Sequence, residues 1–266
     1  MQETEKIQRK NKEVKVDFMD MKKVYEEGSV SKYLIKGTNA TFMNLVRRTI
    51  MTTVPTLAID EVHIYENDSV IYDEMLSNRL GLLPIKTDVK TYKRGDKVKL
   101  VLEKAGPGIV TTKDIKCTDP KIEILDKKIV ITKLGKTEHI KLEMTAVMNS
   151  GDESSKYQPA IVAYNEVMEI DNDKSYDTKK LLEEMPKGNI EVKAGKLFFV
   201  DPYNTTIQNQ HLDILRANGV KVKFSETDFV LTIETTGQLT AKEVLEAAAD
   251  AATQKLEELE EAIKKL

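Results

Sequence analysis

The sequence predicts an α+β fold, and three stretches of the 266-residue chain carry this prediction. Residues 38–50 place apolar side chains at helical spacing, strand patterns dominate from about Val54 to Ile170, and residues 240–266 have the composition of one long helix. The chain is long enough for two or three domains with ordinary cores. With 40% hydrophobic and 32% charged residues, its composition is that of a folded protein rather than a disordered one.

The first predicted elements are a β-hairpin and a helix. Residues 14–19 and 31–35 are the two expected strands, and Glu26-Glu27-Gly28 is the expected turn between them. The apolar residues of the helix that follows recur every three or four positions: Phe42, Leu45, Val46 and Ile50. Either Thr38 or Asn39 can cap its start, and Pro55 prevents its continuation because proline has no N–H to donate.

The middle of the chain reads mainly as strands. Residues 58–65 alternate in polarity, Asn67-Asp68-Ser69 has the residues of a turn, and Asp73 and Glu74 suit the first turn of a short helix. Further strands are expected around residues 98–102 and 140–144, where apolar and charged residues alternate. Residues 122–124 and 129–131 are predicted to form a hairpin around the turn at 126–128.

A third, smaller piece is predicted between residues 171 and 223. A short helix containing Leu181 and Leu182 ends before Pro186-Lys187-Gly188, and residues 190–192 and 197–199 form a hairpin. A second helix starts near Ile207 and ends with Gly219 at its C′ position. The residues expected to form the core of this piece are Leu181, Leu182, Ile190, Phe198, Phe199, Leu212 and Leu215.

The last 27 residues predict a helix of roughly 40 Å, since an α-helix rises 1.5 Å per residue. Thr240 and Glu243 have the spacing of a capping box. Apolar residues form one stripe along the helix: Leu245, Ala248, Ala252, Leu256, Leu259, Ile263 and Leu266. Such a helix either lies on its own domain or extends beyond it and pairs with another chain, and its length favours the second interpretation.

Two neighbouring arginines, Arg47 and Arg48, leave two interpretations open. Adjacent residues on a helix point about 100° apart, so the two side chains cannot share one outer face. Either one arginine is solvated and the other forms a buried ion pair, or one of them faces a partner.

Composition also excludes several classes of protein. A net charge of −3 does not suit a chain whose whole surface clamps nucleic acid, although residues 1–16 are locally basic. No apolar run reaches the roughly 20 residues that cross a bilayer, and the first residues lack the apolar core of a signal peptide. The single cysteine, Cys117, cannot form an internal disulfide. We therefore expect a cytoplasmic protein.

The run NLVRRTIM (44–51) followed by VPTLAIDEVHIYENDSVIYDEMLSNRLGLLPIKT (54–87) resembles the signature of the alpha-type assembly subunits of cellular RNA polymerases. Within this family it is most similar to the archaeal branch, the D-type subunits, which are the counterparts of bacterial alpha and of the eukaryotic third-largest subunit. The resemblance implies a dimerisation domain in two halves, residues 1–53 and 224–266, with an insert domain at 54–170. In the family, Tyr157-Gln158-Pro159 with Ile161 and Val162 would form the strand that closes the insert.

The resemblance also implies partners. The split domain would pair with the smaller alpha-like subunit, L, through the helix carrying Arg47 and Arg48 and through the C-terminal helix. That platform would receive the second-largest and largest subunits, and the insert would contact the second-largest subunit and small assembly subunits. Contact with DNA would be indirect, through the complex. The chain would be a non-catalytic subunit of a nucleotidyltransferase, because the magnesium-binding aspartates belong to the largest subunit.

Interface candidates follow from this resemblance together with the residue pattern. Polar anchors are expected at Arg47, Arg48, Asp73, Glu74 and Arg79. Leu256, Leu259 and Ile263 would form the seam with the smaller subunit. No catalytic, cofactor-binding or metal-ligating residue is expected.

Residues 171–223 resemble the ferredoxin-like domain that the D-type subunits of some archaea carry, but they contain no cysteine. An iron–sulfur cluster takes about four thiolate ligands, so we expect no cluster. A structural remnant or a docking surface is expected instead. Phosphate-loop, EF-hand and zinc patterns also fail on their residues and spacing. Two rival functions remain: a former redox module, and a free-standing nucleic-acid-binding protein that uses the basic N-terminus and the helix carrying Arg47 and Arg48.

Overall fold

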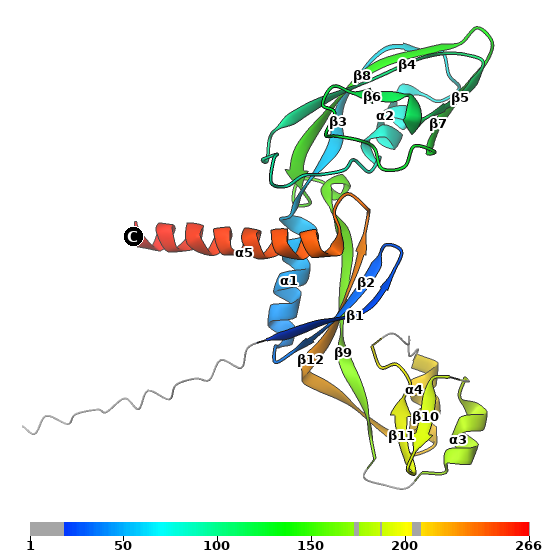
Figure 1. The fold of residues 1–266 in the computed structure, drawn as a ribbon, viewed down its shortest axis with the longest axis vertical. Helices are drawn as coiled ribbons and strands as arrows, with labels where there is room; N and C mark the ends of the chain where they lie inside the picture. Colours follow the sequence, from blue (N-terminus) through cyan, green and yellow to red (C-terminus); the bar gives the residue numbers. More distant parts are fainter. Residues whose placement is uncertain (1–18, 173–175, 187, 204–208, 266) are drawn as a thin grey trace, which may run out of the picture.

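The computed structural model describes residues 19–172, 176–186, 188–203 and 209–265. The fold is α+β, as predicted: helices pack on antiparallel sheets. Figure 1 shows a strand-rich part, a central sheet with two helices, and a small lower part arranged along the long axis. The helix α5 (Ala241–Lys264) projects sideways from the central part.

The central sheet is built from segments far apart in the sequence. Its strand order is β1-β2-β12-β9, and neighbouring strands are antiparallel. The bounds are Asp20–Glu27 for β1, Val30–Lys36 for β2, Ala160–Asp171 for β9 and Lys221–Thr235 for β12. The helices α1 (Ala40–Thr52) and α5 complete this part, whose core includes Met43, Ile50, Phe229, Leu231 and Ile233. Because alternate residues of β12 point to one face, Phe229, Leu231 and Ile233 are buried together.

The N-terminal hairpin differs from its prediction in the position of the first strand. β1 begins at Asp20, so the strand predicted at 14–19 lies outside the described residues except for Met19, which is not in a strand. The turn falls at Gly28, as expected, with φ +57°, a conformation that suits glycine. Glu27 is paired with Val30 directly beside this turn. The strand therefore continues to the turn instead of ending several residues before it.

The predicted helix of residues 38–50 is α1, and Asn39 rather than Thr38 is its N-cap. The Asn39 Oδ1 accepts a hydrogen bond of 2.9 Å from the Phe42 N–H, one of the N–H groups without a partner inside the helix. Pro55 is the first residue of the next strand, where its missing N–H is tolerated.

The strand-rich part contains a sheet of order β3-β8-β4-β6 and a smaller β5-β7 pair. The bounds are Pro55–Asn67 for β3, Lys97–Ala105 for β4, Gly108–Thr111 for β5, Ile115–Cys117 for β6, Val130–Leu134 for β7 and His139–Ser150 for β8. The helix α2 (Asp73–Gly81) buries Leu76 and Leu80 in the same core, and the 3-10 turns η1 (Thr112–Asp114) and η2 (Ser155–Tyr157) connect strands. The predicted strands around 98–102 and 140–144 are confirmed in β4 and β8.

The hairpin predicted around residues 126–128 is wrong. Ile124 forms only an isolated bridge with Ile85, whereas β7 pairs with β5. The turn itself is present, since the Lys128 N–H donates to Asp126 Oδ1 at 2.8 Å. The segments before and after the turn pair with different parts of the chain, Ile85 and β5. Two short apolar runs on either side of a turn do not by themselves identify the strands with which they pair.

The lower part has the predicted order of elements: α3 (Thr178–Glu184), β10 (Ile190–Lys193), β11 (Lys196–Phe199) and α4 (Asn209–Ala217). Gly219 follows α4 with φ +75°, as expected of a C′ glycine, while the predicted start at Ile207 lies outside the described residues. Two predicted core residues are exposed instead, Leu182 by 43% and Phe198 by 42%. Phe198 is opposite Glu191 on the outer face of the hairpin, and Leu182 points away from the neighbouring, buried Leu181.

Two long strands link the central and lower parts. β9, which the predicted boundaries assign to the insert, is hydrogen-bonded to β12 in the central sheet. Near its end, Met168 and Ile170 pack against the core of the lower part. The four domain boundaries stay predictions, since cores and strands overlap along these two elements.

Buried polar side chains join the strand-rich part to the central part. Gln238 is buried, and its Nε2 donates to the Leu57 carbonyl at 3.1 Å. The Thr87 N–H donates to the Gln238 carbonyl at 3.1 Å, and Thr56 Oγ1 donates to the Tyr157 carbonyl at 2.7 Å. Because buried polar groups are costly when unpaired, these bonds favour one orientation of the two parts.

Candidate partner interface

The two halves of α5 differ in how they pack: the first lies on the central core and the second is exposed. Its start is the predicted capping box: Thr240 Oγ1 accepts from the Glu243 N–H, and Glu243 Oε2 accepts from the Thr240 N–H at 2.8 Å. This bond to the backbone N–H holds the pKa of the Glu243 carboxyl below its ordinary value. The first half of the helix is anchored on the central core by Val244 and Ala248, which are buried.

From residue 253 to residue 265 every side chain of α5 and of its C-cap is exposed. This half includes the three residues predicted to form a seam, Leu256, Leu259 and Ile263, which are 67%, 56% and 59% exposed. Figure 1 shows this end of the helix extending away from the rest of the chain. The interpretation in which the helix lies on its own domain therefore holds only for the first half.

The helix α5 also contacts α1, which exposes apolar side chains of its own. Phe42 is 39% exposed and Leu45 is 53% exposed. The two helices are in contact, and Lys255 Nζ lies 3.2 Å from Thr53 Oγ1 just after the end of α1. A large exposed apolar surface on a monomer commonly marks an interaction site. The structure thus leaves two apolar helix surfaces, one on α5 and one on α1, uncovered by this chain's described residues.

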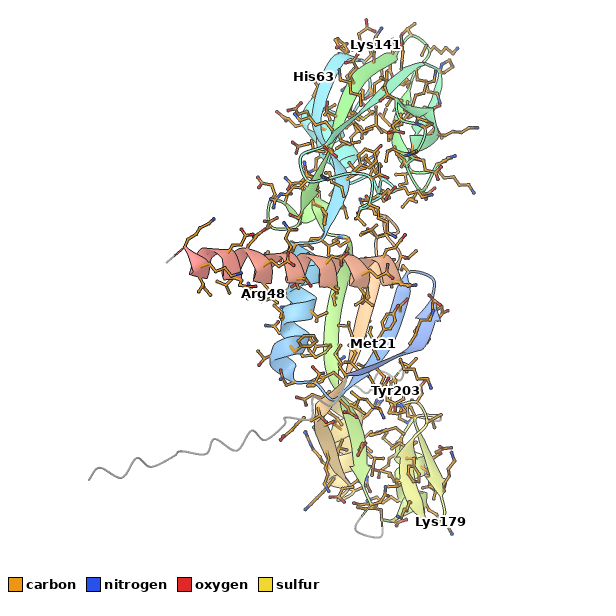
Figure 2. The ribbon with its side chains drawn as sticks, turned by 60° about the vertical axis from the view of Figure 1, so that its left-hand side comes forward. Met21, Arg48, His63, Lys141, Lys179 and Tyr203 are labelled. Atoms are coloured by element: carbon orange, nitrogen blue, oxygen red, sulfur yellow. The ribbon has the colours of Figure 1, made fainter. Side chains whose placement is uncertain are left out.

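The predicted polar anchors on α1 lie in different surroundings. Arg48 is exposed and projects from α1 below α5 (Figure 2), whereas Arg47 is half-buried. Arg47 donates to Asn44 Oδ1 from both Nε and Nη2, at 3.3 and 3.0 Å. Within the described residues, neither arginine lies within ion-pairing distance of a carboxylate. The interpretation with a buried ion pair inside this chain therefore finds no support, and the role of both residues at an interface stays a prediction.

The other three polar candidates lie on α2, in the strand-rich part, and the fold does not bring them to α5. Asp73 Oδ1 accepts from Asn67 Nδ2 at 2.7 Å, which ties α2 to the preceding turn. Arg79 Nη1 donates to the Ile131 carbonyl at 2.8 Å, and Glu74 is exposed in the first turn. Asp73 and Arg79 thus make hydrogen bonds within the strand-rich part, and interface roles for all three candidates stay predictions.

One exposed apolar set escaped the sequence-based prediction of interface residues. Around β3, the following turn and α2, five large apolar side chains are 59–81% exposed: Tyr65, Val70, Tyr72, Met75 and Leu82. Aromatic residues and methionine are enriched at protein interfaces. The sequence did contain an indication of this set, since Val70 and Tyr72 follow the turn at residues 67–69, where polar residues are usual.

The described part of the chain contains neither a group of metal-ligating side chains nor a membrane-spanning helix. Within residues 19–265, apart from the gaps named above, no group of three or more His, Cys, Asp or Glu side chains is placed to hold a metal ion. Among the described helices, none combines the length and apolarity that crossing a membrane takes.

Known proteins are similar to most of this chain. A family profile described as the RNA polymerase Rpb3/Rpb11 dimerisation domain matches residues 32–256. A relative from Methanopyrus kandleri, named DNA-directed RNA polymerase subunit Rpo3, is 33% identical over 91% of this chain and 94% of its own length. Proteins of the same name from Methanosarcina acetivorans and Halobacterium salinarum are 34% and 30% identical, over 86% and 92% of this chain and 92% and 97% of their own lengths.

Proposed function

Because the chain belongs to the family of RNA polymerase Rpb3/Rpb11 dimerisation-domain proteins, we propose that it is an assembly subunit of a DNA-directed RNA polymerase. The resemblance to alpha-type polymerase subunits is thereby confirmed. In this role the chain supports DNA-templated transcription by holding other subunits rather than by reacting with nucleotides.

The observation that carries this proposal is the exposed second half of α5. The stripe of Leu256, Leu259 and Ile263 continues the face by which the same helix packs on its own core through Leu245 and Ala248. When the apolar stripe of an amphipathic helix extends beyond its own domain, it is suited to pack against a similar surface of another chain. Burying three such side chains, at about 1.5–3 kcal/mol each, would contribute substantially to association.

The proposed partner on this surface is the smaller alpha-like subunit, L. The pair would form a platform for the two large catalytic subunits, and the exposed apolar set around α2 would meet the second-largest subunit or small assembly subunits. Arg48, exposed on α1 beneath α5, is a polar candidate for the proposed interface with the smaller subunit. DNA would be reached only through the assembled enzyme, and the cytoplasmic location stays part of this proposal.

The chain alone is expected to synthesise no RNA. Phosphoryl transfer by polymerases uses paired magnesium ions held by clustered acids, together with groups that hold the triphosphate. The sequence has no phosphate-binding loop and no clustered acidic motif of that kind. The measurement is nucleotide incorporation by the homogeneous chain on a primed template. Synthesis that is abolished by a substitution within this chain would contradict the proposal.

Purified without oxygen, the chain is expected to be colourless and to contain no stoichiometric iron or acid-labile sulfide. The lower part has an apolar core of its own, which includes Leu181, Ile190, Leu197, Phe199 and Leu215. Chelators should therefore leave its thermal unfolding unchanged, whereas a domain folded by metal would lose stability. An absorption band near 400 nm with about one cluster per chain by iron analysis would overturn this expectation.

A further inference from the structure

A groove of about 1400 Å³ separates the first half of α5 from the strand-rich part. One wall is α5, and the other is the loop of residues 86–94 together with Lys121. Pockets for small molecules usually measure about 300–1000 Å³, so this groove is large for such a ligand. Its size suits a segment of polypeptide.

The two walls carry opposite charge. Lys90, Lys93 and Lys121 are exposed on the loop side, and within the described residues none lies within ion-pairing distance of a carboxylate. Glu246 and Asp250 are exposed on the α5 side. The only salt bridge of these two acids within the described part is that of Glu246 with Lys242 on its own helix, at 3.6 Å. Across the groove, no salt bridge within the described residues joins the two rows, although Lys90 contributes to the lowered pKa of the Glu243 carboxyl on the α5 side.

Between the charged walls the lining is apolar, and the loop is held in place. Ala247 and Ala251 of α5 and Val89 and Tyr92 of the loop are half-buried there. The Asp88 carboxylate accepts from the N–H groups of residues 90 and 91, and Asp96 Oδ2 accepts from the N–H of residue 93 at 2.7 Å. A loop that is already ordered loses less conformational freedom on binding.

The groove and the apolar stripe lie on nearly opposite faces of α5. At about 100° per residue, positions 243, 246, 250 and 254 centre roughly 150° from positions 256, 259 and 263. A partner that covers the stripe therefore cannot fill the groove with that same part of its surface. At its far end the groove reaches Gln254 and Glu258, so its occupant would lie close to that partner.

We propose that this groove is the docking site for a mixed-charge, extended segment of a third polypeptide in the assembled polymerase, different from the chain that covers Leu256, Leu259 and Ile263. Acidic side chains of the segment meet the lysine wall, and basic ones meet α5. The acidic wall disfavours nucleic acid, because it would repel the phosphates that the lysines attract. This inference rests on the proposed assembly function.

The test uses maleimide labelling of the full chain in three states: free, paired with the smaller subunit, and in the complete polymerase. Ala251→Cys reports on the groove and Leu259→Cys on the stripe, both in a Cys117→Ser background because Cys117 is the only cysteine. We expect Ala251→Cys to label in the first two states and to be protected at least about tenfold only in the complete enzyme. Leu259→Cys should already be protected in the pair.

Charge reversal sharpens the test. Lys90→Glu with Lys93→Glu should restore labelling of Ala251→Cys in the complete enzyme by about tenfold, because like charges would then face each other. Lys113→Glu, on an exposed lysine outside the groove, should leave the protection unchanged. A photoreactive maleimide at Ala251→Cys should cross-link to a polypeptide other than the smaller subunit.

Several outcomes would overturn the inference. They are equal labelling of Ala251→Cys in the complete enzyme, protection already in the pair, and protection that nuclease removes. If the chain instead fails to enter the polymerase at all, the proposed function itself is wrong, and the docking site falls with it.

Discussion

Leu259→Asp is expected to weaken binding of the smaller alpha-like subunit by about two to four orders of magnitude. Leu259 is 56% exposed in the free chain and lies in the middle of the stripe that the partner would cover. A carboxylate buried there without a counter-charge costs about 3–5 kcal/mol, and each 1.4 kcal/mol is a factor of ten in affinity. An association of micromolar strength, worth about 8 kcal/mol, would be largely lost.

Glu258→Ala is the matched control for this substitution. Glu258 is the neighbouring residue, is exposed, and lies off the apolar stripe, where single surface charges contribute about 0–1 kcal/mol. Both variants are titrated against the purified smaller subunit by calorimetry. Equal, near-native binding of the two would show that the interface lies elsewhere.

The same surface predicts the behaviour of the unpartnered chain. With Leu256, Leu259 and Ile263 uncovered, the chain should self-associate or be poorly soluble, and co-expression with the smaller subunit should rescue it. Leu259→Asp should then improve the solubility of the free chain while it weakens the pair. A free wild-type chain that is monomeric at high concentration in sedimentation experiments would count against the exposed stripe.

Phe229→Ala is expected to destabilise the central part by about 3–5 kcal/mol, a large share of the 5–15 kcal/mol by which most domains are stable. The ring is 1% exposed, lies in the core between the sheet and α1, and contacts Tyr164 edge to face at 6.0 Å between centroids. Removing the ring leaves a cavity that the side chains of the sheet on one side and of α1 on the other cannot fill.

Phe224→Ala on the same strand is the control, because Phe224 is 44% exposed beyond the irregularity in β12 and should cost well under half as much. The measurement is amide hydrogen exchange together with chemical denaturation. In Phe229→Ala, protection should fall in β2, β9 and β12 and persist in β3, β4 and β8, whose core is a separate cluster. Equal destabilisation by the two substitutions would contradict this description of the core.

Local structure was largely predictable from the sequence because its causes are local. The capping box of Thr240 and Glu243, the C′ glycine after α4 and the spacing of α1 depend on residues within one or two helical turns. The pairing of β7 with β5 and of β9 with β12 was not predictable in the same way. A strand's partner is set by contacts far away in sequence, and a short apolar run fits several partners equally well.

The candidate interface was predicted in part, for a physical reason. The stripe on α5 is periodic, so Leu256, Leu259 and Ile263 could be selected from spacing alone, and their exposure agrees with a partner surface. The sequence could not tell where along α5 the domain ends, because Ala248 and Leu259 continue the same period. Nor could it place Arg79 on the Ile131 carbonyl, a contact that depends on how α2 packs beside β7.

The rival functions make different demands on the chain. A redox module would have to hold a cluster with a single cysteine, and Cys117 lies in β6, away from the lower part. Desolvation raises the pKa of the Cys117 thiol, which disfavours the thiolate that binds metals. A free-standing nucleic-acid binder would use charge attraction and would lose affinity steeply as salt increases.

Affinity purification of the tagged chain from native extract, washed at high salt with the retained chains identified by mass spectrometry, tests the central claim most directly. An assembly subunit held by apolar surfaces on α5 and α1 should retain the smaller alpha-like subunit and both large polymerase subunits through that wash. Recovery of the chain alone, or with nucleic acid that salt removes, would contradict its role as a polymerase assembly subunit.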